Sequence, residues 1–188
     1  DSDLRWHHVL WSLDFREPSG RLFLKHLTFS NERQRVIIRL LQISTDWTKR
    51  FSESGGHAAA PDEASIQMHW KLSVLQYGAA ACEKWLEWIR SLEADDRFKG
   101  KLNMPSAAYK LLSEQGSAWI REMPAKCVSE LEIEGSSLKS TFERKPGPWM
   151  GSLLDKLLQE TALGQVENER KALLKRAEQI MRSEQVDQ

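Results

Sequence analysis

The stretch RKPGPWMGSLLDKLLQETALGQVENE, residues 144–169, decides the fold that this sequence predicts. After a Pro-Gly-Pro-Trp corner, an apolar stripe at helical spacing leads to Gly164 and then to Asn168. Glycine supplies the permissive backbone of a helix stop, and asparagine is a favoured N-cap. We therefore expect one helix to end at Gly164 and a second to be capped by Asn168, so that the two form a helical hairpin. The stripe of the first helix comprises Trp149, Leu153, Leu154, Leu157, Leu158 and Ala162.

Helical spacing of apolar residues continues on both sides of this stretch. The second hairpin helix carries Leu173, Leu174, Ala177, Ile180 and Met181 on one side. Upstream, the same spacing predicts helices within residues 4–14, 22–27, 32–43, 63–77, 81–92 and 106–123. Asp62 is placed to cap the fourth of these helices, and Gly78 separates the fourth from the fifth. Pro124 ends the last helix.

Alternation typical of a strand appears only at Val128, Leu131 and Ile133, which is too short to imply a sheet, and Gly135 marks a turn. The sequence therefore predicts an all-α protein. We expect a multi-helix body at residues 1–123 and a tail with the helical hairpin at 124–188, without a substantial sheet.

Composition limits the possible functions. Lys and Arg number 27, as do Asp and Glu, so the molecule as a whole has no net charge that would attract nucleic acid or a membrane. Any such binding must be local, and residues 139–182 hold nine basic against six acidic side chains. Cys82 and Cys127 lie far apart without a CxxC motif or a secretory segment, which favours the cytoplasm. No apolar run approaches the ~20 residues of a membrane helix. The first residue is Asp1 rather than Met, so we expect a processed chain or a fragment.

Common catalytic motifs are missing from the sequence. It contains no GxxxxGK[ST], HExxH or GxSxG pattern. Asp1 and Asp3 have the DxD spacing of metal-dependent nucleotidyl transfer, but without a strand or a Gly-rich approach we do not expect catalysis there. The histidines share no ligand spacing with cysteines or acidic residues, and we expect each, His7 included, to face solvent or the edge of the core. We predict no catalytic residue, metal ligand or cofactor site in this chain.

Residues 131–177 resemble the C-terminal part of bacterial CCA-adding enzymes, the class II tRNA nucleotidyltransferases. The resemblance rests on the order and spacing of a Leu-x-x-x-Gly entry at Leu131 and Gly135, Lys145-Pro146, Gly147-Pro148-Trp149, Gly164 and Val166-Glu167-Asn168-Glu169. It extends more weakly to RLFLKHLTFSNERQRVI, residues 21–37, which is similar to the body region of that family. Neither the head's carboxylate motif nor the neck's Arg and Asp pattern is present.

The resemblance implies a body-and-tail portion of an enzyme that adds C, C and A to the tRNA 3′ end, using Mg²⁺, CTP and ATP. In that family the body and tail hold the acceptor stem and the elbow of tRNA, and the catalytic head and the neck complete the enzyme. We therefore expect this chain to bind tRNA, to be inactive alone, and to lack cofactors of its own.

Basic residues flanking the hairpin helices are the candidate RNA contacts, with a solubilising surface as the alternative interpretation. They are Lys139, Arg144 and Lys145 before the first helix and Arg170, Lys171, Lys175 and Arg176 on the second. Five further residues match the family pattern and are assigned to architecture. We expect Trp149 to bury its ring and Asn168 to satisfy helix amides; the others are Gly147, Pro148 and Gly164.

Two other functions stay open. The chain could be a helical protein-interaction module with tryptophan-rich faces, or the same portion of a related CC-adding, A-adding or poly(A) polymerase. The tryptophans of the interaction hypothesis are Trp6, Trp11, Trp85 and Trp88. Helical spacing beside Ile89 and Leu92 favours a place in the core for Trp85 and Trp88.

The fragment hypothesis makes a prediction about the surface. If the head and the neck are missing, apolar side chains near residues 4–15 should be exposed.

Overall fold

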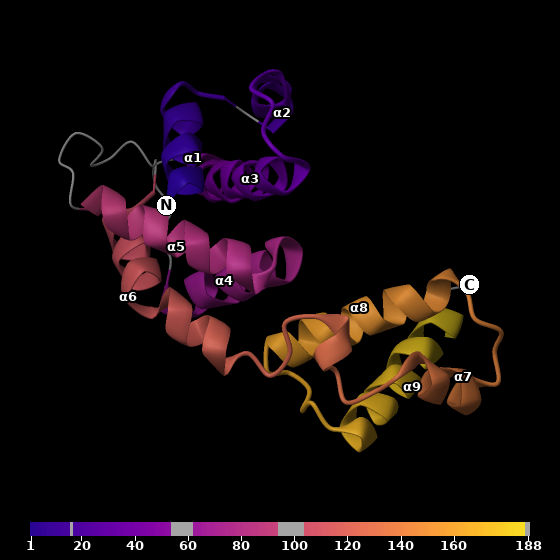
Figure 1. The fold of residues 1–188 in the computed structure, drawn as a ribbon. Helices are drawn as coiled ribbons and strands as arrows, with labels where there is room; N and C mark the ends of the chain where they lie inside the picture. The colour runs from indigo at the N-terminus through magenta and orange to yellow at the C-terminus, as the bar shows by residue number, and fades with distance from the viewer. Residues whose placement is uncertain (16, 54–61, 94–103, 187–188) are drawn as a thin grey trace. The chain divides into compact units, whose positions relative to one another are not determined.

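A computed structural model describes residues 1–15, 17–53, 62–93 and 104–186. These residues form nine α-helices and one 3-10 helix and contain no strand, which confirms the predicted all-α class. The chain forms two compact units, Asp1–Trp119 and Ile120–Gln188, and each is described by itself (Figure 1). The functional division into a body and a tail at 123/124 stays a prediction.

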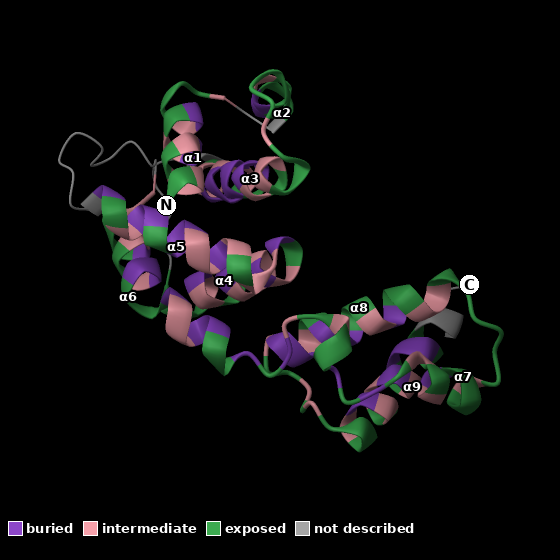
Figure 2. Ribbon diagram, viewed as in Figure 1, coloured by how far each residue is buried: buried purple, intermediate pink, exposed green. Residues whose placement is uncertain are grey.

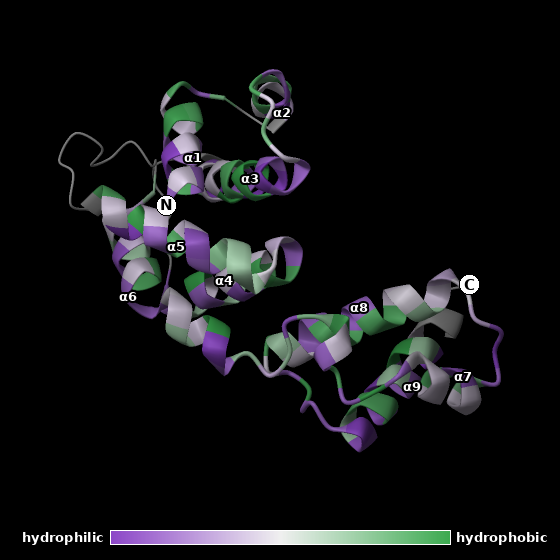
Figure 3. Ribbon diagram, in the orientation of Figure 1, coloured by the Kyte–Doolittle hydropathy of each residue, from purple (hydrophilic) through white to green (hydrophobic). Residues whose placement is uncertain are grey.

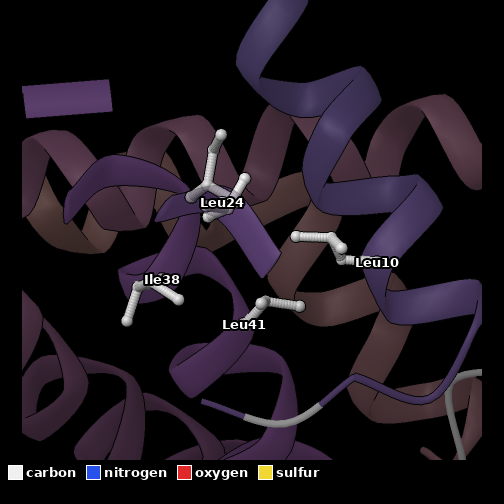
Figure 4. Close-up of a cluster of buried hydrophobic side chains, with 5 residues drawn as sticks. Leu10, Leu24, Ile38 and Leu41 are labelled. Carbon is white, nitrogen blue, oxygen red and sulfur yellow. The ribbon is translucent and has the colours of Figure 1, made fainter. Parts of the chain in front are cut away.

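The first unit is built around α3. Its helices are α1 (Ser2–Ser12), α2 (Glu17–His26), α3 (Asn31–Glu53), α4 (Glu63–Tyr77), α5 (Ala79–Glu93) and most of α6 (Ser106–Glu122). The central helix α3 packs against α1, α2, α4 and α5, and buried residues recur along it (Figure 2). Figure 4 shows one cluster of these buried side chains, in which Leu10 of α1 and Leu24 of α2 pack against Ile38 and Leu41 of α3.

Tryptophans form a second part of this core. Trp70 and Trp85 are fully buried, Trp88 and Trp47 nearly so, and successive rings lie 5.7–6.3 Å apart. Each of these indole N–H groups has an acceptor. Trp70 donates to the Gly116 carbonyl and Trp85 to the Ser44 hydroxyl. Trp88 donates to His8 Nδ1, and Trp47 donates to the Ser73 hydroxyl. The core assignment of Trp85 and Trp88 is therefore confirmed.

His7 departs from the sequence-based expectation. Its side chain is fully buried, with Nε2 3.1 Å from Ser44 Oγ and the ring packed edge-on to Trp88. The helical period that places apolar residues on α1 also turns His7 inward, and the Ser44 hydroxyl on α3 supplies a polar partner for one of its two ring nitrogens, Nε2. Exposed apolar side chains are present near residues 4–15 as expected, at Val9 on α1 and at Leu13 directly after this helix.

The second unit contains the 3-10 helix η3 (Val128–Glu130), α7 (Gly135–Phe142), α8 (Pro148–Ala162) and α9 (Arg170–Val186). The predicted apolar sides of α8 and α9 pack against each other, and hydrophobic and hydrophilic residues alternate along both helices (Figure 3). Leu154 and Leu174 are only half-buried. The core of this pair is Leu153, Leu157, Leu158, Ala162, Leu173, Ala177, Ile180 and Met181.

Two predictions about the entry to this unit are wrong. Gly135 is not a turn but the first residue of α7, and a Cβ there would lie 2.9 Å from Met150 Sδ, so the glycine leaves room for the Met150 side chain. Asn168 is not the N-cap of α9, which begins at Arg170. Leu131 and Ile133, which gave the strand-like pattern, are buried beside η3 without forming a strand.

None of the helices that the structure describes combines the length and the apolar character needed to span a membrane.

Candidate nucleic-acid interface

The corner before α8 is held by Trp149. Its Nε1 donates to the Lys145 carbonyl at 2.9 Å, and its ring meets Phe142 edge-on, with centroids 6.0 Å apart. Pro148 occupies the first position of α8, where its missing N–H is no loss. The Trp149 side chain is half-buried. These contacts fold the 143–147 segment back on the start of α8.

Arg144 and Lys145 are exposed on this corner. The Arg144 guanidinium lies 5.5 Å from the centre of the Trp149 ring, a cation–π contact that orients the side chain. The backbone of Glu143 is left-handed, with φ of 46°, and ends α7 just before Arg144. The corner therefore presents two adjacent cations at the surface.

The turn between α8 and α9 is closed by a Schellman arrangement. Gly164 has φ of 74°, its N–H donates to the Thr161 carbonyl at 2.9 Å, and Gln165 N–H donates to the Glu160 carbonyl at 2.8 Å. These bonds satisfy carbonyls at the end of α8. The predicted helix stop at Gly164 is confirmed.

Asn168 connects the hairpin to the segment before it. Its Nδ2 donates to the carbonyls of Pro124 and Glu130 at 3.3 and 2.8 Å, and its Oδ1 accepts from Glu132 N–H at 2.9 Å. The carboxamide thus satisfies backbone groups of residues 124–132 rather than the amides of α9. A sequence pattern for capping could not reveal partners that lie more than thirty positions away.

Six of the seven predicted RNA contacts are exposed. The Nη2 of Arg170 donates to Ser137 Oγ at 3.3 Å, which joins the first residue of α9 to α7, where Lys139 lies. Within the described part of the chain, no carboxylate lies within ion-pair distance of Lys139, Lys145, Lys171 or Lys175. The exposed set is Lys139, Arg144, Lys145, Arg170, Lys171 and Lys175.

Arg176 is the exception, because its charge is already matched. Its Nε and Nη2 donate to the two carboxylate oxygens of Glu160 at 2.7 and 2.6 Å, and these hydrogen bonds raise the pKa of Arg176. The charge of Arg176 is therefore shared with Glu160, and its role as an RNA contact stays a prediction. Glu160 was not identified from the sequence as a partner of Arg176. The two residues are separated from Asn168 by the same number of positions in the sequence, one on each side.

A groove opens beside this pair, along the end of α8, the following turn and α9. Its volume is about 540 Å³, and Gln165, Glu167, Lys175 and Gln179 line it with Glu160 and Arg176. The groove was not predicted from the sequence, since it depends on how α8 and α9 pack.

In the described ranges, no three His, Cys, Asp or Glu side chains come together as metal ligands would.

Comparison with known proteins gives one match. Residues 107–177 match the family model described as tRNA nucleotidyltransferase domain 2. The match covers less than half of the chain, from α6 to α9, and includes all seven predicted RNA contacts. It supports a tRNA nucleotidyltransferase-type body region over these residues. Neither the curated proteins nor the solved structures contain a match to this chain.

Proposed function

We propose that this chain is the tRNA-binding portion of a tRNA nucleotidyltransferase that adds CCA to tRNA 3′ ends. The observation that carries the proposal is the match over residues 107–177, which includes all seven candidate RNA contacts. The four lysines without a carboxylate partner in the described residues add support, because free ammonium groups on a surface can bind phosphates.

Binding in this proposal uses phosphate contacts and shape. RNA duplexes are recognised through backbone and 2′-OH contacts rather than through base edges in their deep groove. Lys145 and Arg144 lie on the corner before α8, and Lys171 and Lys175 lie one turn apart on α9. These two groups would hold the acceptor stem and the elbow, while a head domain supplies the catalytic carboxylates with Mg²⁺, CTP and ATP.

The first experiment is a salt series of binding between the full chain and folded tRNA. The comparison RNA is a hairpin of equal length that lacks the elbow. We expect a preference for tRNA and an affinity that falls linearly with salt on logarithmic axes. Equal binding of both RNAs, or none, would overturn the proposal and leave a protein-interaction module as the better account.

Charge reversal tests the contacts themselves. Lys145→Glu and Lys171→Glu should each weaken tRNA binding and lower the salt slope by about one, with little change in Tm because both side chains are exposed. Lys25→Glu is the matched control, since Lys25 is exposed on α2 outside the matched residues. Equal losses in all three variants would remove Lys145 and Lys171 from the contact set.

The interaction-module alternative has lost part of its basis. Trp85 and Trp88 are buried and have no free face to offer a partner. Trp6 and Trp11 are partly buried against the α1–α3 core cluster. The remaining support for this alternative is the formal net charge of zero, which does not by itself attract nucleic acid.

A further inference from the structure

The groove beside α9 has the size of a small-molecule site. Its volume of about 540 Å³ falls within the range of roughly 300–1,000 Å³ that ligand pockets occupy. Gln165, Val166 and Glu167 line it from the turn after α8, and Lys175, Arg176 and Gln179 line it from α9. All of these except Gln179 lie within the residues that match the nucleotidyltransferase family.

The guanidinium of Arg176 is fixed in orientation within this groove. Glu160 accepts two hydrogen bonds from it, and Gln179 Oε1 accepts a third, from Nη1 at 3.1 Å. A bidentate pair of this kind holds the planar guanidinium in one orientation. The Arg176 side chain nevertheless keeps 38% of its surface exposed, against 19% for Glu160. The groove thus contains a flat, immobilised and accessible cationic surface.

The charges of the groove are balanced. Glu160 and Glu167 oppose Lys175 and Arg176, so an isolated phosphate gains no net attraction there. Carboxamides at Gln165 and Gln179 and the carboxylate of Glu167 offer both donors and acceptors. A neutral, flat ligand with donors and acceptors along its edge fits this lining better than an anion does.

We propose that the groove binds an unpaired base of RNA, with the Arg176 guanidinium as the stacking surface and the side chains of Gln165, Glu167 and Gln179 at the edge of the base. Bases that leave the stack in loops, bulges and ends are bound on guanidinium planes and by hydrogen bonds to their edges. Paired bases cannot enter, so the groove selects unpaired nucleotides. This inference rests on the proposed tRNA binding and adds a base contact to phosphate contacts.

Nucleotide titration of the full ¹⁵N-labelled chain tests the groove directly. The probes are AMP, GMP, CMP and UMP at millimolar concentration, with ribose 5-phosphate as the control that lacks a base. We expect the mononucleotides to shift the amide signals of Gln165, Val166 and Ala172 and the Arg176 Nε signal, while ribose 5-phosphate leaves them in place. Equal shifts with ribose 5-phosphate, or none with any nucleotide, would overturn the inference.

Arg176→Lys removes the planar surface but keeps the positive charge. We expect this variant to lose the nucleotide-induced shifts and to bind tRNA about tenfold more weakly, with an unchanged salt slope. Arg182→Lys is the matched control, because Arg182 also pairs with a carboxylate on α9, Glu178 at 3.7 Å, but does not line the groove. Thermal melting of both variants checks folding. Wild-type behaviour of a folded Arg176→Lys chain would contradict a stacking role.

The two proposals can fail separately. Salt-dependent, elbow-selective tRNA binding without nucleotide shifts would keep the proposed function and remove the base site. Nucleotide-induced shifts confined to the groove, without tRNA binding, would keep the base site and remove the proposed function. Because the wild-type titration requires no variant, the test does not depend on how Arg176→Lys folds.

Discussion

Asn168 shows how a single side chain determines the local path of the second unit. Its carboxamide uses both donors and its acceptor on the backbone of three residues, Pro124, Glu130 and Glu132. A carboxamide is the natural group for this position, because two carbonyls require donors while one N–H requires an acceptor. The contact ties the segment before α7 to the start of α9.

Asn168→Asp tests this assignment with a change of one atom. A carboxylate still accepts from Glu132 N–H but cannot donate to the two carbonyls, and its charge faces their oxygens. We expect a loss of about 1–3 kcal/mol in the free energy of unfolding, measured by urea denaturation. Gln159→Glu, the same exchange at an exposed position of α8, should change stability by less than about 0.5 kcal/mol. Equal stability of the two variants would refute the role of Asn168.

His7 makes stability depend on pH. Burial, and secondarily the neighbouring His8, lowers the pKa of His7 to about 3 from its ordinary value of 6.5. Between pH 6.5 and 3 the unfolded chain binds a proton that the folded chain does not. Stability is therefore complete above pH 6.5 and falls as pH decreases, by about 1.4 kcal/mol per pH unit from this group.

Replacing His7 with Gln removes this titration. We expect the difference in unfolding free energy between wild-type and His7→Gln chains to shift in favour of the variant as pH is lowered from 7.5 to 5. Urea denaturation at several pH values measures it, and the carboxylates common to both chains cancel in the difference. Parallel pH profiles would show that His7 is accessible to protons in the folded state.

At the scale of elements, helix ends are set by local chemistry. Asp62 caps α4 by accepting from Ser65 N–H at 2.7 Å, as its sequence position predicts. Gly78 separates α4 from α5 with φ of 88°, and Gly164 ends α8 with φ of 74°. Because these signals involve neighbours within a few positions, the sequence predicts them well.

Two Gly→Ala exchanges, one within α8 and one directly after it, should change the free energy of unfolding in opposite directions. A Cβ at Gly164 meets no atom within 4 Å, so Gly164→Ala isolates the cost of the left-handed backbone, about 1–2 kcal/mol of destabilisation. Gly151 lies inside α8 with equally free space, so Gly151→Ala should stabilise the chain by about 0.5–1 kcal/mol. Urea denaturation measures both. Destabilisation by both variants would indicate a packing constraint that the structure does not show.

Features set by packing escaped prediction. The glycine at 135 indicated a turn, but it permits Met150 to approach the start of α7. The inward position of His7 depends on Ser44, which lies 37 residues away. The Glu160–Arg176 pair and the groove beside it arise from the contact of α8 with α9. Periodicity identifies which side of a helix is apolar, but not which polar side chain meets a partner across the interface.

At the scale of the whole molecule, the formal net charge is zero, so RNA binding has to depend on where the cations lie. Long-range attraction scales with net charge, whereas the salt slope of binding counts the phosphates contacted locally. The proposed contacts lie on the second unit, while exposed arginines such as Arg35 and Arg39 lie on α3 of the first.

Two double reversals separate net charge from location. Lys171→Glu with Lys175→Glu on α9, and Arg35→Glu with Arg39→Glu on α3, each reverse two exposed cations four residues apart. Each reversal changes the charge by two, so both chains go from 0 to −4. If tRNA binds at the hairpin, the α9 pair should lower the salt slope by about two and weaken binding strongly. The variant with both α3 residues reversed should keep the wild-type salt slope. It should lose only the smaller part of the affinity that the negative net charge costs both double variants. Equal slopes for the two variants in a fluorescence-anisotropy salt series would place the RNA contacts elsewhere.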